Sequence, residues 1–72
     1  MDSRHLLHEI QNHLDSVIAQ DTPLARGLWQ HFIDLHPADI ADFFTDIDLE
    51  KAHELFKKLP RRLQTEVFEE FS

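Results

Sequence analysis

The sequence predicts an all-α fold, a superhelical array of about five short helices. From residue 40 onward, apolar side chains recur every twelve residues and form three rows. The rows are Phe43, Leu55 and Val67; Phe44, Phe56 and Phe68; and Ile47, Leu59 and Phe71. Within one copy these residues stand at i, i+1 and i+4, a spacing that gathers side chains on one side of an α-helix. One such helix cannot bury its apolar side alone, so neighbouring copies must stack, as in a helical solenoid.

The composition agrees with short helices joined by tight connections. The 72 residues include one Gly and three Pro, which suits helices better than a loop-rich or all-β domain. We expect residues 1–72 to form a single all-helical domain or a fragment of one. In this organisation residues 1–21 form a leading helix and residues 22–72 hold the repeats of about twelve residues.

The last copy of the repeat has no following copy to cover it. A domain of this size buries only about 60% of its unfolded surface, so an uncovered apolar side is a large loss. Val67, Phe68 and Phe71 are the residues that would need a cover. We therefore expect that a further repeat is missing and that the chain is a fragment of a longer protein.

The leading helix is expected over residues 3–20. Its apolar stripe consists of Leu6, Leu7, Ile10, Leu14, Val17 and Ile18. The spacing of this stripe is that of an amphipathic helix. Thr22 is the expected N-cap of the next helix and Pro23 its first residue, because the N–H that proline lacks has no partner there.

The second helix is expected over residues 23–34. Its apolar side consists of Leu24, Leu28, Trp29, Phe32 and Ile33. Gly27 lies in its interior, where Gly costs about 1 kcal/mol relative to Ala. A close approach of the leading helix at Gly27 would account for this residue.

Three further helices complete the array. They span residues 37–46, 49–58 and 61–70. His36 stays outside the first of them because a residue before proline avoids the α region. Asp48 is the expected N-cap of the second, with Glu50 in its first turn, and Pro60 precedes the third. Helices this short do not persist alone, so packing must hold them.

Charge and motifs exclude several classes of function. Seven basic and fourteen acidic residues leave a net charge of −7, which disfavours nucleic acids and anionic lipid surfaces. The basic cluster of Lys57, Lys58, Arg61 and Arg62 is interpreted as solvated charge facing a helix dipole. There is no Cys, no apolar run of the ~20 residues that a membrane span requires, no glycine-rich phosphate loop and no nucleophile elbow. We therefore expect that the chain is not an enzyme and does not itself enter a membrane.

The leading helix carries a weak metal-binding pattern. His5, His8 and Glu9 stand at i, i+3 and i+4, a spacing that can present two imidazoles and a carboxylate to zinc or nickel. The zinc-protease pattern needs His-Glu-x-x-His, whereas His8, Glu9 and His13 have one residue too many. A solvated polar surface is the favoured interpretation.

Two acidic sets are candidate sites for a hard cation such as Mg²⁺. Asp39, Asp42 and Asp46 fall on one side of a helix, and Glu66, Glu69 and Glu70 form a second set. Mg²⁺ prefers carboxylate oxygens and retains most of its water, so it needs no closed cage of protein ligands. Solvated charge is the simpler interpretation of both sets.

Two segments carry a family resemblance. They are Leu35-His36-Pro37-Ala38-Asp39-Ile40-Ala41 and Leu59-Pro60-x5-Glu66-Val67. With them, residues 24–72 resemble the cytosolic N-terminal domain of MgtE-type magnesium transporters. In that family the domain is a superhelix of short helices that precedes paired CBS domains and a transmembrane pore.

The resemblance implies a regulatory role at the cytoplasmic face of the inner or plasma membrane. It implies that the domain and the CBS domains of a homodimeric transporter take up Mg²⁺ between them and that their approach shuts the pore. The resemblance places a magnesium-contacting residue at Glu66, in a weak site shared with other domains. The alternative is a helical-repeat protein-interaction module or chaperone, of a flagellar type, without metal sensing. CBS repeats and apolar spans in the remainder of the gene would favour the transporter, and a coiled coil or a stop codon the alternative.

Overall fold

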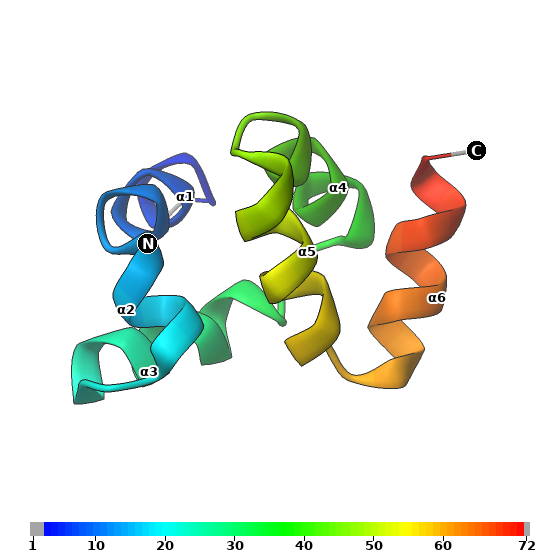
Figure 1. Ribbon diagram of the computed structural model, residues 1–72. Helices are drawn as coiled ribbons and strands as arrows, with labels where there is room; N and C mark the ends of the chain where they lie inside the picture. The colour runs from blue at the N-terminus through cyan, green and yellow to red at the C-terminus, as the bar shows by residue number, and fades with distance from the viewer. Residues whose placement is uncertain (1–2, 72) are drawn as a thin grey trace. The chain divides into compact units, whose positions relative to one another are not determined.

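A computed structural model describes residues 3–71, and in this range the chain forms six α-helices and no β-strand. The prediction of an all-α fold is confirmed. The helices are α1 (Ser3–Asn12), α2 (Leu14–Ala19), α3 (Pro23–Phe32), α4 (Pro37–Thr45), α5 (Leu49–Lys58) and α6 (Arg61–Glu70) (Figure 1). They belong to two compact units, residues 1–34 and residues 35–72.

In the first unit, α1 and α2 both pack on α3. Its core consists of Leu6, Ile10, Val17, Ala25, Leu28, Trp29 and Phe32. The rings of Trp29 and Phe32 stack with their centroids 5.4 Å apart. This stack joins two successive positions of the apolar side of α3, as the helical spacing of these residues predicts.

The prediction of one helix over residues 3–20 is wrong, because the helix breaks at His13. The His13 backbone lies outside the helical region, at φ −121° and ψ 31°. An unbroken helix over residues 3–19 would be about 25 Å long, whereas the ten residues of α3 span only about 15 Å. The break lets both segments lie against α3, and Ile10 and Val17 on either side of it are completely buried.

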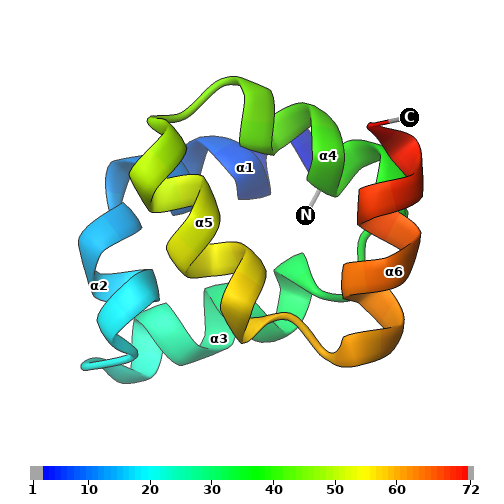
Figure 2. The same ribbon diagram turned by 45° about the vertical axis from the view of Figure 1, so that its right-hand side comes forward.

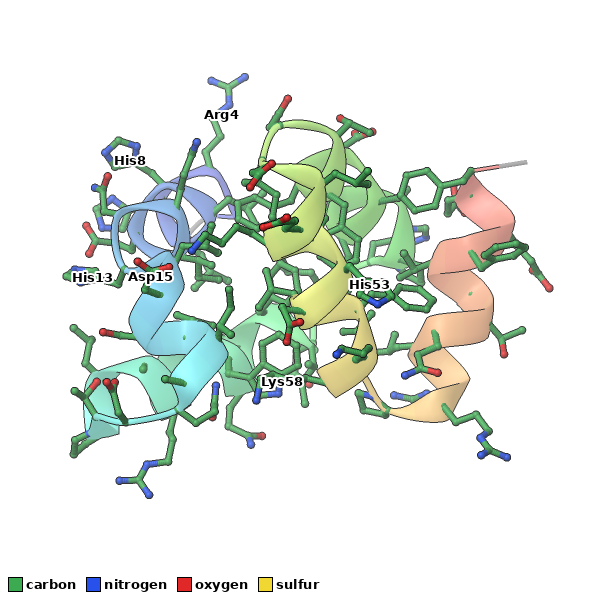
Figure 3. All side chains as sticks on the ribbon, viewed as in Figure 1. Arg4, His8, His13, Asp15, His53 and Lys58 are labelled. Carbon is green, nitrogen blue, oxygen red and sulfur yellow. The ribbon has the colours of Figure 1, made fainter. Side chains whose placement is uncertain are left out.

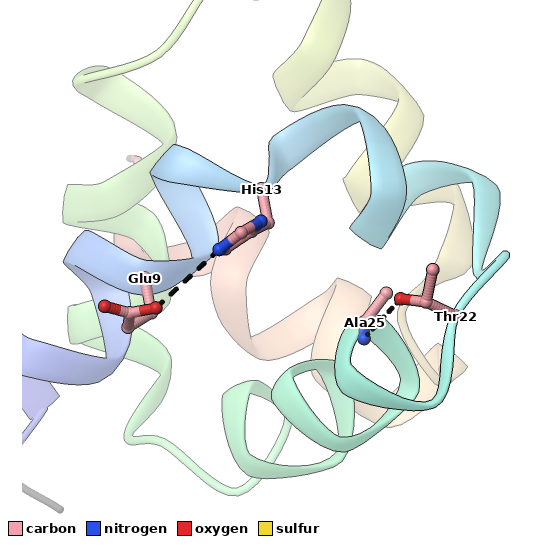
Figure 4. Close-up of polar contacts among 4 residues, drawn as sticks. All are labelled: Glu9, His13, Thr22 and Ala25. Atoms are coloured by element: carbon pink, nitrogen blue, oxygen red, sulfur yellow. Dashed lines mark hydrogen bonds and ion pairs between the residues drawn. The ribbon is translucent and has the colours of Figure 1, made fainter.

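The connection between α2 and α3 ends one helix with a residue that was not predicted and begins the next with the predicted N-cap. Gln20 adopts the left-handed conformation, with φ 56°, and its N–H donates to the carbonyl oxygen of Ser16 at 2.7 Å. Thr22 is the N-cap of α3: its Oγ1 accepts a hydrogen bond of 3.0 Å from the N–H of Ala25 (Figure 4). Pro23 is the first helical residue, as expected.

Two details of α3 differ from the prediction. The helix ends at Phe32, two residues before the expected end at Asp34. Gly27 is exposed, and a Cβ placed on it would have no atom within 4 Å other than those of its chain neighbours and the nearby backbone of α3. No element of the first unit approaches Gly27 closely, so the predicted reason for a glycine at this position is wrong.

In the second unit, α4 packs on both α5 and α6 (Figure 2). The buried side chains are Ile40, Ala41, Phe43, Phe44, Ala52, Leu55, Leu59, Leu63 and Val67. The observed bounds of α5 and α6 are those predicted, and α4 ends one residue early, at Thr45.

The ends of these helices are held partly by residues that the sequence did not indicate. Asp48 occupies the N-cap position of α5, but its side chain makes no capping hydrogen bond. At the start of α4, by contrast, the side chain of His36 does form a cap: its Nδ1 atom accepts a hydrogen bond of 3.1 Å from the N–H of Ala38. Gln64 of α6 uses its Nε2 to donate to the carbonyl oxygens of Phe56 and Leu59, each at 3.1 Å. The Phe56 carbonyl also accepts from the N–H of Leu59 at 3.1 Å, so the Gln64 amide adds a second hydrogen bond there and ties the start of α6 to the end of α5.

The three rows of the repeat differ in how deeply their side chains are buried. Phe43, Leu55 and Val67 are all buried, so the expectation that Val67 lacks a cover is wrong. In the second row Phe44 is 7% exposed, Phe56 is half-buried, and Phe68 is 66% exposed. In the third row Leu59 is buried but Phe71 is 51% exposed. The expected lack of cover is thus confirmed for Phe68 and Phe71.

Candidate functional site

The acidic residues of α4 form an exposed surface on the side of the helix away from its core. Asp39, Asp42 and Asp46 are all exposed, whereas Ile40 and Phe44 on the other side are buried. Asp39 stands in the first turn of α4, where its charge also favours the helix dipole. All three carboxylates are therefore open to solvent, two on α4 and Asp46 at its C-cap, and their use as a cation site stays a prediction.

The acidic residues of α6 form a second exposed surface. Glu66, Glu69 and Glu70 are all exposed and stand at i, i+3 and i+4, where side chains of a helix are neighbours. Leu63 and Val67 face the core from the same helix. Glu66 therefore has its carboxylate available to solvent, or to a ligand held by another domain.

Neither acidic surface forms a closed metal site. Among residues 3–71, no three or more His, Asp or Glu side chains come together as a group that could hold a metal ion. The assignment of Glu66 as a magnesium ligand is not tested by this geometry, since a shared site needs only one or two ligands from this chain. It stays a prediction.

The histidines of the leading segment lie on the exposed side of α1 and at its end. His5 and His8 are exposed on α1. Glu9 instead contacts His13, with 3.8 Å between Glu9 Oε2 and His13 Nε2 (Figure 4). Whether His5, His8 and Glu9 bind zinc or nickel is not tested by this geometry, and a solvated polar surface stays the prediction.

The basic cluster lies at the junction of α5 and α6. Lys57 and Lys58 occupy the last turn of α5, where positive charge favours the helix dipole. Figure 3 shows Lys58 at this end of the helix. Lys57 also forms an exposed ion pair with Glu54, with 3.3 Å between Nζ and Oε1. Such a pair is worth little, and this arrangement agrees with the interpretation as solvated charge.

The second unit contains an apolar groove of about 460 Å³, which we call the aromatic groove. It is lined by Phe44, Thr45, Ile47, Leu49, Ala52, His53, Phe56, Phe68 and Phe71. His53 stands on the α5 side of the groove (Figure 3). The groove is open to solvent, and three of its large apolar lining residues are exposed: Leu49 is 82% exposed, and Phe68 and Phe71 are each more than half exposed.

Sequence reasoning found only part of this groove. The twelve-residue rhythm identified Phe68 and Phe71 as residues without a cover. It did not indicate Leu49, the first residue of α5. The missed signal was an apolar residue directly after an N-cap position, where a helix has no preceding turn against which to bury it.

Fold and surface together define an all-helical, acidic module. None of its described helices is long and apolar enough to cross a membrane. The family model of the MgtE intracellular N domain matches residues 35–72, just over half of the chain. The chain therefore belongs to this family of intracellular transporter domains. No curated protein and no solved structure matches it.

Proposed function

We propose that this chain is the regulatory, Mg²⁺-sensing domain of an MgtE-type magnesium transporter, acting at the cytoplasmic face of the membrane. The observation that carries the proposal is the coincidence of two features in residues 35–72: the family match and both exposed acidic surfaces. The domain has no catalytic role in this proposal. It binds Mg²⁺ weakly and transmits its occupancy to the pore.

The mechanism rests on the repulsion between acidic surfaces. The chain has a net charge of −7, so a second acidic domain is held off until cations neutralise the carboxylates between them. Two unit charges 4 Å apart interact by about 1 kcal/mol in water and about 4 kcal/mol near a protein surface. A divalent ion between two carboxylates reverses the sign of this interaction, so rising Mg²⁺ draws the domains together. The partners in this proposal are the CBS domains and pore of the same homodimeric protein.

Glu66 is the residue we assign to the shared ion. Its carboxylate is exposed on α6, and Glu69 and Glu70 beside it raise the local negative charge. Because Mg²⁺ keeps several waters, one carboxylate from this chain and others from a CBS domain suffice to hold it. An affinity in the millimolar range is expected for the half of the site that this chain supplies.

The test is a titration of the chain with MgCl₂, followed by amide chemical shifts in NMR spectra. We expect saturable shifts centred on Glu66, and their loss in Glu66→Gln. The matched control is Glu54→Gln, an exposed carboxylate on α5 that is already paired with Lys57, which should leave the shifts in place. NaCl at equal ionic strength separates binding from screening. Equal responses of the two variants would contradict the assignment of Glu66.

The second candidate is a helical interaction module or flagellar-type chaperone without metal sensing. The observation in its favour is the aromatic groove, which leaves Leu49, Phe68 and Phe71 exposed on one side of the unit. Magnesium shifts that only follow ionic strength, together with the capture of a protein ligand in the groove, would favour this candidate over the sensor.

A further inference from the structure

Arg62 is a basic residue whose place the helix dipole does not explain. It stands in the first turn of α6, where there is no acidic residue. By contrast, α4 and α5 place Asp39 and Glu50 in their first turns, where negative charge favours the positive end of the dipole. The two lysines at the end of α5 also agree with the dipole of their helix. The dipole of α6 therefore opposes the charge of Arg62.

Arg62 shares one side of α6 with the proposed magnesium ligand. Glu66 follows it by four residues and Glu69 by seven, so the three side chains lie within about 40° of one another around the helix axis. All three are exposed, whereas Leu63 and Val67 of the same helix are buried. Residues four apart on a helix are neighbours, with about 5–6 Å between their Cβ atoms. Arg62 is therefore the basic residue of α6 whose position brings it next to Glu66.

No fixed ion pair holds either of these two side chains. In the part of the chain that the structure describes, neither Arg62 nor Glu66 has an oppositely charged partner within ion-pair distance. The Glu66 carboxylate is thus open to two cations: the guanidinium on its own helix and an ion from solution.

The two cations oppose each other at this carboxylate. An Mg²⁺ ion at Glu66 carries twice the charge of the guanidinium, and the repulsion between them decreases with distance and with ionic strength. The attraction between Arg62 and the carboxylate is also lost when the ion takes its place. Both effects lower the occupancy of Glu66 at a given Mg²⁺ concentration. Glu69, on the other side of Glu66 along the helix, acts in the opposite direction.

We propose that Arg62 sets the Mg²⁺ concentration at which Glu66 responds, because its positive charge weakens the binding of the ion. The domain then stays unoccupied until the concentration is high. This inference rests on the proposed function, since it concerns the ion at Glu66, and it adds a residue that the proposed mechanism does not use. Arg61 carries the same charge one residue earlier, but it is turned by about 140° from Glu66 around the helix axis and should have little influence.

The test compares Arg62→Gln with Arg61→Gln, each of which removes one positive charge from an exposed position in the first turn of α6. The chain is titrated with MgCl₂ at low ionic strength, and the amide chemical shift of Glu66 is followed by NMR. We expect the concentration at half-saturation to fall about threefold in Arg62→Gln and by less than about 1.5-fold in Arg61→Gln, because the second charge is farther from the ion. Arg62→Lys keeps the charge and should respond as the parent does.

Two further measurements separate an electrostatic role of Arg62 from a structural one. In high NaCl the difference between Arg62→Gln and the parent should disappear, because salt screens charges at this distance. A change of structure would persist in salt. Circular dichroism should show the same helix content for both glutamine variants, since both change an exposed residue at the same end of α6.

The outcomes distinguish this inference from the proposed function. Saturable shifts at Glu66 that respond alike in the two glutamine variants would overturn the role of Arg62 and leave the proposed function in place. A higher concentration at half-saturation in Arg62→Gln would do the same. If the parent and Arg62→Gln both lack saturable shifts, or if Glu66→Gln retains them, the proposed function fails and this inference fails with it.

Discussion

The burial of the second aromatic row makes a quantitative prediction about stability. We compare Phe44→Ala with Phe68→Ala, two truncations of the same side chain in the same row of the repeat. Phe44 is 7% exposed and its ring lies 6.4 Å from that of Phe56, whereas Phe68 is 66% exposed. Removing a buried phenyl ring costs about 3–5 kcal/mol. A ring buried by only a third should cost about 0.5–1 kcal/mol, a third of the value for full burial.

These costs are large against the total stability of so small a chain. At about 0.05–0.15 kcal/mol per residue, 72 residues have a free energy of unfolding of about 4–11 kcal/mol. Phe44→Ala should therefore remove about a quarter of it or more. With a urea slope near 1 kcal/mol/M, the midpoint should fall by about 3 M or the second unit should be unfolded in buffer. Phe68→Ala should move the midpoint by less than about 1 M.

The assay is urea unfolding followed by circular dichroism in the far ultraviolet, on both variants and the parent. Phe56→Ala, at a half-buried position, should fall between them. Equal midpoints for Phe44→Ala and Phe68→Ala would refute the reasoning. They would mean that the burial of each ring does not determine how much it contributes to the free energy of unfolding. A larger loss at Phe68 than at Phe44 would refute it more strongly.

Three smaller predictions concern helix ends and interiors, all measured as urea midpoints. Gly27→Ala should raise the free energy of unfolding by about 0.5–1 kcal/mol, because the added methyl meets no other residue; a loss of stability would show that the site is closed. Thr22→Ala should lower it by about 1 kcal/mol through loss of the cap on Ala25, while Thr22→Ser keeps the hydroxyl and should change little. Gln64→Ala should lower it by about 1–2 kcal/mol, because the amide donates to two carbonyls at the end of α5. Gln64→Glu keeps the size of the side chain but removes the donor, so it should cost at least as much. Unchanged midpoints for both variants would show that these hydrogen bonds do not stabilise the chain.

Helix bounds were predictable where local chemistry sets them. Pro60 cannot continue a helix, and with Lys57 and Lys58 before it the end of α5 and the start of α6 were located to the residue. Thr22 and Pro23 likewise located the start of α3. At each of these places the cause lies within a few residues of the effect, so the amino-acid sequence is sufficient.

The candidate site was predictable only as a set of residue types. The exposure of Asp39, Asp42 and Glu66 follows from their helical positions relative to the apolar rows, and the structure agrees. Which carboxylate binds an ion depends on ligands that another domain would supply, and no spacing within this chain specifies them. The place of Leu49 in the aromatic groove was not predicted, because the groove also includes residues of α4 and α6 that are distant from Leu49 in the sequence.

By itself, the sequence determined the helical class, the stacking of short helices and most of their ends, because periodicity and capping are properties of neighbouring residues. Only the tertiary structure decided the break at His13, the burial of Val67 and the place of Leu49 in the aromatic groove. All three rows carry apolar side chains at the same interval, and nothing in that interval distinguishes a covered row from an open one. That distinction depends on which helix packs against which, and α4 lies against both later helices while one side of α5 and α6 stays open.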